Sequence, residues 1–231
     1  MRGARSEEME LFQTFLTTMS APEAQRGTDI YLWRNRAGEY KRTFSSKSTW
    51  EQLRDHSPAV NWFKTVWFKE FVPRCSFITW LAVQNRLPTK DRLRNWGLNV
   101  PAACVLCISG TETHDHLFFD CEFSRDIWRD LASRIWQNPP LDLSSVITWI
   151  LQPRPSPHAS ASVIIKLLFQ AAVYLIWKER NSRIFKNISS TSGAIRVSVD
   201  RLIRDRLLSL PSTDGSPSLL EFYFGCIKLF P

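Results

Sequence analysis

Length, composition and charge restrict the kinds of protein that this sequence can encode. The chain has 231 residues, of which 44% are hydrophobic and 23% are charged. This balance is typical of a globular protein and not of a disordered one. The formal net charge of +8 favours a polyanionic partner such as nucleic acid, although the acidic residues are interleaved with the basic ones.

We expect no secretory signal, because the stretch "MRGARSEEMELFQTFL" is charged and has no apolar core. The longest uncharged apolar run, residues 167–177, is flanked by Lys166 and Lys178 and is too short to span a bilayer. We therefore expect an intracellular protein of the nucleus or cytoplasm, which is not secreted and has no membrane partner. In a reducing compartment its five cysteines are metal ligands or buried thiols and not disulfides.

The first half of the chain is expected to hold a polar lead-in and a β-hairpin. Residues 1–28 form the lead-in, and a domain over residues 29–136 follows. The hairpin has aromatic-rich strands at 31–33 and 40–44 around a turn at Arg36-Ala37-Gly38. A short helix comes next in "SKSTWEQLRDH", with Ser48 or Thr49 as its N-cap.

The pattern is helical from residue 62 to residue 97. Phe77, Trp80 and Leu81 have the spacing of one core-facing stripe. In "LPTKDRLRNWG", Thr89 is placed to cap a compact helix that Gly97 ends. We expect Trp96 to pack into the core of this domain, with stacking on a nucleic-acid base as the alternative.

The C-terminal part is expected to be mostly helical. A helix capped by Ser124 follows the cysteine cluster. A Pro/Ser-rich loop or linker covers residues 137–161, and a C-terminal helical segment covers residues 162–231. The segment starts with an apolar, buried helix over 162–186, and its tail at 220–230 is a strand or a docking segment. The predicted fold class is therefore mainly α, with an N-terminal hairpin, a small zinc knuckle and C-terminal helices.

The stretch "CVLCISGTETHDHLFFDC" gathers three cysteines and two histidines into residues 104–121. Cys104 and Cys107 have the Cys-x2-Cys spacing of a zinc knuckle, and His116 and Cys121 return two more ligands after a short loop. His114 competes with His116 for the role of the imidazole ligand; otherwise it is a solvated side chain or a neighbour of the ligands. Such a closed set of four ligands predicts a structural Zn²⁺ site.

The spacing between the last two ligands sets a geometric condition. Five residues of an ideal α-helix advance by about 500°, which leaves the side chains of His116 and Cys121 roughly 140° apart. We therefore expect a bend or break in the chain near residues 120–123.

These motifs carry a resemblance to a known family. "FITWLAVQNRLPTKDRLRNWG", "CVLC" and "ETHDHLFFDCEFSRDIW" resemble the zinc-binding domain at the C-terminal end of plant non-LTR (LINE-type) reverse transcriptases. The stretches "DIYLWRNRAGEYKRTFSSKSTWEQL" and "YLIWKERNSRIF" are similar to its flanking segments. The resemblance implies that Cys104, Cys107, His116 and Cys121 are the ligands, and that the chain is a detached C-terminal portion of such a protein.

The resemblance and the charge together predict a zinc-stabilised nucleic-acid-binding module. The chain has no Asp-Asp pair, no phosphate-binding loop and no arguable nucleophile, so we expect neither polymerase activity nor a small-molecule substrate. Phosphates of RNA or DNA would contact the basic residues before the knuckle, which are Arg86, Lys90, Arg92 and Arg94. The alternative is a structural or protein-interaction remnant of a retroelement polyprotein, with the polymerase domain as its partner.

Overall fold

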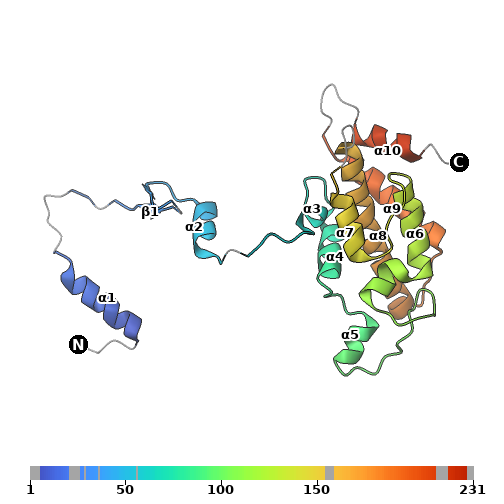
Figure 1. The fold of residues 1–231 in the computed structure, drawn as a ribbon, viewed down its shortest axis with the longest axis horizontal. Coiled ribbons are helices and arrows are strands. Elements are labelled where there is room, and N and C mark those ends of the chain that lie inside the picture. The colour runs from blue at the N-terminus through green and yellow to red at the C-terminus, as the bar shows by residue number, and fades with distance from the viewer. Residues whose placement is uncertain are drawn as a thin grey trace. The chain divides into compact units, whose positions relative to one another are not determined.

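The protein is described by a computed structural model that covers residues 6–20, 27–28, 30–35, 37–55, 57–153, 159–211 and 218–227 (Figure 1). The chain divides into two compact units, Met1–Pro58 and Ala59–Pro231. Helices make up most of the second unit, and one two-stranded sheet is present among the described residues. The predicted mainly α class is thereby confirmed, whereas the predicted domain boundaries at 28, 136 and 161 stay predictions.

The first unit contains helix α1 (Glu7–Thr18), strands β1 (Trp33–Arg34) and β2 (Tyr40–Lys41), and helix α2 (Ser46–Leu53). The strands form the predicted antiparallel hairpin, with Trp33 opposite Lys41. Gly38 takes a φ of 83° in its turn, a conformation that glycine adopts without a steric penalty. The predicted turn residue Arg36 lies outside the described residues.

Helix α2 begins earlier than the sequence pattern indicated. The side chain of Ser45, not that of Ser48 or Thr49, accepts the capping hydrogen bond from the backbone N–H of Ser48. Neither α1 nor α2 has a buried residue. The helices of this unit are therefore held by caps and local contacts, without a core of their own.

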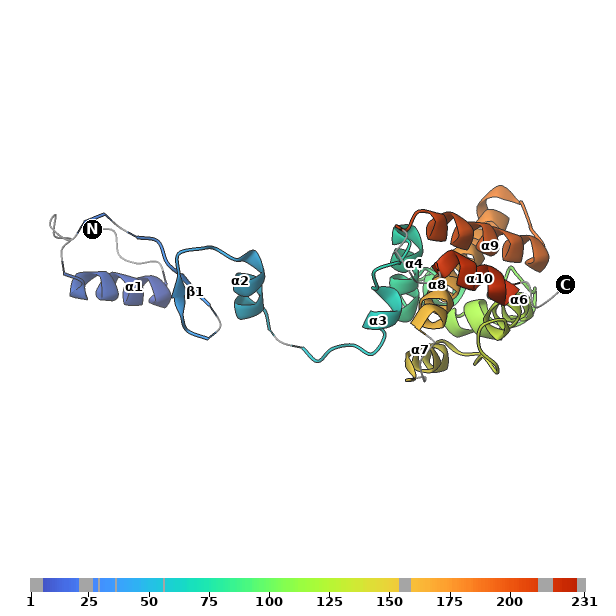
Figure 2. The same ribbon diagram turned by 90° about the horizontal axis from the view of Figure 1, so that it is seen from above.

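The second unit is a bundle around one long central helix, α8 (Figures 1 and 2). Helices α3, α4, α6, α7, α9 and α10 all contact α8. The helices of this unit are α3 (Phe63–Val66), α4 (Pro73–Val83), α5 (Lys90–Asn95), α6 (Glu122–Ser133), α7 (Leu143–Leu151), α8 (Ala159–Lys186), α9 (Ser192–Leu208) and α10 (Leu219–Ile227).

Helix α8 is buried around most of its circumference, as predicted. Ile164, Ile165 and Phe169 are fully buried, and the ring of Phe169 lies 5.9 Å from that of Trp128 on α6. The helix is long and apolar enough to cross a membrane by length and composition alone, but 67% of its most apolar window is buried inside the fold. Such a high degree of burial is typical of a core helix.

Three local expectations for the second unit were wrong. Of the two alternatives for the tail, the strand is wrong, because Leu219–Ile227 forms helix α10, whose contacts with α8 and α9 agree with a docking segment. The predicted loop 137–161 contains α7, which Asp142 caps by accepting from the N–H of Ser145. Helix α6 begins at Glu122 with Cys121 as its N-cap residue, while Ser124 is buried and donates its hydroxyl to the carbonyl of Leu117.

Candidate metal centre

The knuckle that carries Cys104 and Cys107 is a tight hairpin-like loop. Its ends are joined by a β-bridge between Ala103 and Thr111, and the N–H of Cys104 donates to the carbonyl of Gly110. Gly110 has a φ of 72°, and a Cβ atom at this position would lie 3.0 Å from the His116 ring. The loop therefore needs glycine here, both for its backbone conformation and for the approach of the imidazole.

The second pair of ligands comes from a π-helical turn, η2 (His116–Asp120), and the residue after it. The N–H of Cys121 donates to the carbonyl of His116, five residues earlier. A turn closed in this way contains one more residue than an α-turn, so His116 and Cys121 lie near the same face. Cys121 then takes an extended conformation, with ψ 128°, and α6 begins. The predicted break near residues 120–123 is confirmed.

The four side chains converge on one point. The ligand atoms of Cys104, Cys107, His116 and Cys121 all lie within 4.8 Å of one another. The Sγ atoms of Cys104 and Cys121 are 4.0 Å apart, and Sγ of Cys107 is 3.3 Å from Nε2 of His116. Zn–S and Zn–N bonds of ordinary length place tetrahedral ligand atoms roughly 3.5–3.8 Å apart. The site therefore has the size and the donor set that Zn²⁺ requires.

The surroundings of the ligands favour a cation. Nδ1 of His116, on the ring side away from the cysteines, lies 3.6 Å from a carboxylate oxygen of Asp120. A carboxylate in this position orients a ligating imidazole and strengthens it as a donor. The hydrogen bond between Cys104 and Cys121 lowers the pKa of Cys104 to about 5, and it raises the pKa of Cys121. This hydrogen bond therefore favours deprotonation of Cys104 over that of Cys121.

His114 has a different role from the one that its sequence position suggested. Its side chain is 5% exposed, and the structure places it outside the group of four ligands. Nε2 accepts a hydrogen bond from the N–H of Leu87, and Nδ1 lies 3.3 Å from the hydroxyl of Thr89. Burial lowers the pKa of His114. The expectation of a solvated side chain was therefore wrong: His114 ties the turn before α5 to the metal loop.

A buried ion pair fixes the metal loop to α8. Glu112 and Arg180 are 0% and 2% exposed. Oε1 of Glu112 accepts hydrogen bonds from Nη2 of Arg180 at 2.8 Å and from Nε at 3.0 Å. The same oxygen accepts from the backbone N–H of Lys90 at the start of α5. One carboxylate therefore connects the metal loop, α5 and α8.

A second arginine of α8 holds the knuckle itself. Nη1 of Arg183 donates to the carbonyl of Leu106, between the two knuckle cysteines, at 2.9 Å. Its Nε donates to Glu179 at 2.7 Å, and Glu179 also accepts from the N–H of Ser190. The sequence reasoning missed this contact and the Glu112–Arg180 pair. The available signal was the group of charges in "WKERNSR" within a helix that is otherwise buried.

The four basic residues proposed for phosphate contact do not form one free surface. Nζ of Lys90 donates to the carbonyl of Ala103 at 2.6 Å, and Nη1 of Arg94 donates to that of Val100 at 3.0 Å. Arg92 lies over the ring of Trp96, 5.2 Å from its centroid. The side chain of Arg86 is exposed. Trp96 is 57% exposed, so the expectation that it packs into the core was wrong.

Comparison with known proteins identifies the region around this site. Residues 44–128 match the model of the family described as zinc-binding in reverse transcriptase. Searches of curated proteins and of solved structures found no match for the chain. The matched residues include the knuckle, the π-turn and the first half of α6, and all four converging ligands lie within them. Residues 44–128, which make up less than half of the chain, are therefore similar to the zinc-binding domain of reverse transcriptases.

Proposed function

We propose that Cys104, Cys107, His116 and Cys121 bind one structural Zn²⁺, which holds a module that binds nucleic acid. The observation that carries the metal assignment is the convergence of four ligand atoms within 4.8 Å. A site with four protein ligands leaves no open position for a substrate or a reactive water, so its role is to hold the fold. The zinc would join the knuckle to the start of α6.

The distribution of charge supports the nucleic-acid part of the proposal. Residues 59–231 contain 21 lysines and arginines against 14 aspartates and glutamates, whereas residues 1–58 contain nine against eight. Nearly all of the positive excess thus belongs to the unit that contains the metal centre. The lysines and arginines that make up this excess would contact phosphates, and phosphate contacts do not distinguish one base sequence from another.

We also propose that the chain does not polymerise nucleotides. The family match is to a zinc-binding domain and not to a catalytic polymerase domain. The sequence has no adjacent aspartate pair, which the resembled polymerases use to hold their metal ions. The family match and the missing aspartate pair together support an origin of the chain in the C-terminal part of a non-LTR, LINE-type reverse transcriptase.

Metal analysis of the purified protein tests the zinc assignment. We expect about one zinc per chain, and we expect Cys107→Ser to lose it. Cys226→Ser is the matched control, because Cys226 lies on α10, outside the ligand group. Full zinc content in Cys107→Ser would contradict the assignment.

Binding to labelled RNA and DNA over a range of salt concentrations tests the second part. We expect affinity for both that falls steeply as salt rises, because phosphate contacts release counterions. Absence of binding at low salt would contradict this part and leave the zinc assignment intact.

A protein-interaction function is the second candidate, and one observation favours it. Helix α1 has no buried residue, and it exposes Leu11 by 67%, Phe12 by 55% and Phe15 by 61%. Apolar side chains grouped on one helix are typical of a surface that another protein covers. The polymerase domain of a retroelement protein is the partner of this alternative. Retention of that domain by the full chain, and its loss with Phe12→Ser/Phe15→Ser, would support it.

A further inference from the structure

A basic and aromatic surface surrounds the segment from α3 to α4. Its sequence, "FKTVWFKEFVPRCSF", alternates cations with aromatic rings. We define the α3–α4 surface by the side chains of Lys64, Phe68, Lys69, Arg74, Phe77, Lys166 and Tyr174. The first five belong to this segment, and the last two belong to α8.

Contacts between α3 and α8 bring these groups together. The buried side chain of Gln170 donates to the carbonyls of Thr65 and Val66, at 3.0 and 2.8 Å, and so pins α3 to α8. Lys166 and Tyr174 lie one turn before and one turn after Gln170 on the same side of α8. The side chains of the α3–α4 segment that contact Lys166 and Tyr174 therefore lie on either side of the contact between Gln170 and α3.

The cations of this surface contact ring faces. Nζ of Lys166 lies 5.6 Å from the ring centroid of Phe68, and Cζ of Arg74 lies 5.7 Å from that of Tyr174. Phe77, one turn after Arg74 on α4, is 50% exposed, so the expectation that its side chain faces the core was wrong. The exposed ring of Phe77 can receive a nucleobase, since every base has a π-face, and the cations nearby can contact its phosphates.

No ion pair between described residues involves Lys64, Lys69, Arg74 or Lys166. Glu70 is the acidic residue of the segment, and the backbone carbonyl of Glu70 accepts from Nε of Arg206, a further cation. Burial lowers the pKa of Lys166; nearby Lys64 lowers it further, whereas Glu70 opposes the shift. The positive charge of this surface is thus largely uncompensated.

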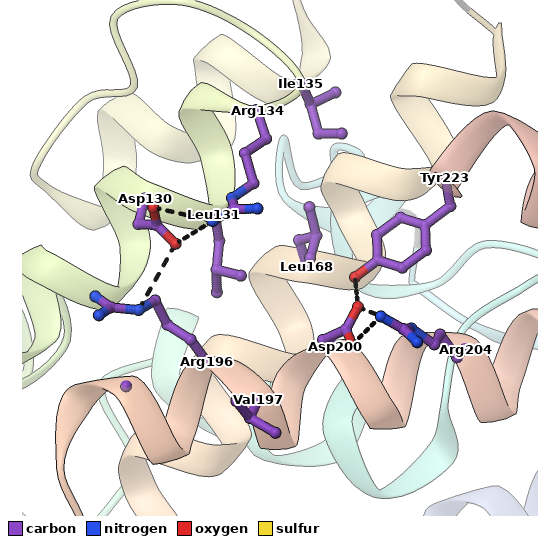
Figure 3. Close-up of a pocket in the computed structure, with 11 residues that line it drawn as sticks. Asp130, Leu131, Arg134, Ile135, Leu168, Arg196, Val197, Asp200, Arg204 and Tyr223 are labelled. Atoms are coloured by element: carbon purple, nitrogen blue, oxygen red, sulfur yellow. Dashed lines mark hydrogen bonds and ion pairs between the residues drawn. The ribbon is translucent and has the colours of Figure 1, made fainter. Parts of the chain in front are cut away.

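The pocket between α6, α9 and α10 shows the opposite arrangement (Figure 3). This cavity of about 280 Å³ is also lined by three arginines. Each of them is paired: Arg134 with Asp130 at 3.1 Å, Arg196 with Asp126 at 2.7 Å, and Arg204 with Asp200 at 2.6 Å. Arginines that carboxylates already neutralise offer little attraction to a phosphate, so the anion-binding candidate is the α3–α4 surface.

We propose that the α3–α4 surface binds single-stranded nucleic acid, with Lys64, Lys69 and Arg74 contacting phosphates and Phe77 stacking on a base. This inference rests on the proposed nucleic-acid function and places it on a different surface from the one that the sequence suggested. Around α5, Lys90 and Arg94 are held by backbone carbonyls. Stacking requires unpaired bases, so the surface should favour a single strand over a duplex.

The test uses the full zinc-loaded chain and labelled twelve-nucleotide RNA, DNA and duplex DNA, followed by fluorescence anisotropy at several salt concentrations. We expect Lys64→Gln/Lys69→Gln/Arg74→Gln to weaken single-strand binding by about tenfold or more, and to reduce the salt slope by about 2, because three phosphate contacts are lost. We expect Phe77→Ala to weaken binding to the single strand more than binding to the duplex.

Two controls separate the possible outcomes. Lys178→Gln/Lys186→Gln/Arg201→Gln removes the same charge from exposed positions on α8 and α9 and should change affinity by less than the first triple variant. Zinc content and circular dichroism check that each variant is folded. Equal losses in the two triple variants would overturn the placement on the α3–α4 surface. Failure of the wild-type chain to bind any of the three probes would overturn the nucleic-acid function itself.

Discussion

The zinc corner, residues 87–121, and the helical body formed by α6, α8 and α9 are stabilised by different forces. The corner buries polar groups, among them Thr89, Glu112 and His114. The body buries aliphatic and aromatic side chains around α8. The body is stabilised by apolar burial. The corner also buries apolar side chains at residues 117–119, but its loop is held to the body by a small number of charged contacts. The two regions should therefore respond separately to metal and to mutation.

Zinc removal should have the largest effect and should act mainly on the corner. Structural zinc contributes about 10–16 kcal/mol of apparent binding free energy in small zinc peptides. With a chelator present, we expect hydrogen exchange to accelerate in peptides that cover residues 98–121 and to stay slow in α9. Cys226→Ser with zinc is the control and should match the wild-type chain. Equal acceleration in α9 would show that corner and body are one cooperative unit.

Arg180→Met should be the next most disruptive change. It leaves the carboxylate of Glu112, which is 0% exposed, without its cation, and breaking such a buried pair costs about 3–5 kcal/mol. Urea unfolding of the zinc-loaded chain measures this loss. Glu112→Gln/Arg180→Met removes both charges and retains an acceptor for the N–H of Lys90. We expect this double variant to be more stable than Arg180→Met alone; lower stability would argue against the ion pair.

Ile165→Ala should destabilise the body without affecting the metal. Ile165 is fully buried on α8, and truncation of such a residue costs about 2–5 kcal/mol. We expect a lower urea midpoint and an unchanged affinity for zinc, measured by competition with a chelator. A parallel loss of zinc affinity would show that the corner depends on packing far from its ligands.

Ile108→Gly should have the smallest effect, and it should be stabilising. Ile108 is 84% exposed and has a φ of 65° directly after the second knuckle cysteine. This conformation costs a side-chain-bearing residue about 1–2 kcal/mol, and part of the gain from glycine is offset by its greater freedom in the unfolded chain. We expect a net gain of up to about 1 kcal/mol in thermal unfolding. Ile108→Ala keeps the strain and should not show the gain.

Much of the metal centre could be predicted from the sequence because its information is local. Ligand type and spacing identified Cys104, Cys107, His116 and Cys121 as one group. Helical periodicity also required a break after His116. The π-turn that provides this break could not be predicted, because its formation depends on how residues 117–119 pack into the core.

The contacts that hold the centre could not be predicted, because they join distant segments. Glu112 meets Arg180, and Leu106 meets Arg183, only when α8 packs against the metal loop. The sequence has no marker for such pairs beyond charges inside an apolar helix. The N-caps of α2 and α6 were predicted wrongly because more than one nearby residue could fill each cap. Ser45 and Cys121 are the N-cap residues, whereas the sequence pattern also allowed Ser48 and Ser124.

The π-turn makes the interval between the third and fourth ligands the least adjustable length in the domain. Gain of one residue between His116 and Cys121 would rotate the thiol by about 100°, and gain or loss of a residue would also shift the start of α6, since Cys121 is the residue before that helix. The length of the loop between Cys107 and His116 does not set both a ligand direction and the start of a helix. Insertions and deletions in related chains should therefore collect in that loop and spare the four positions after the histidine.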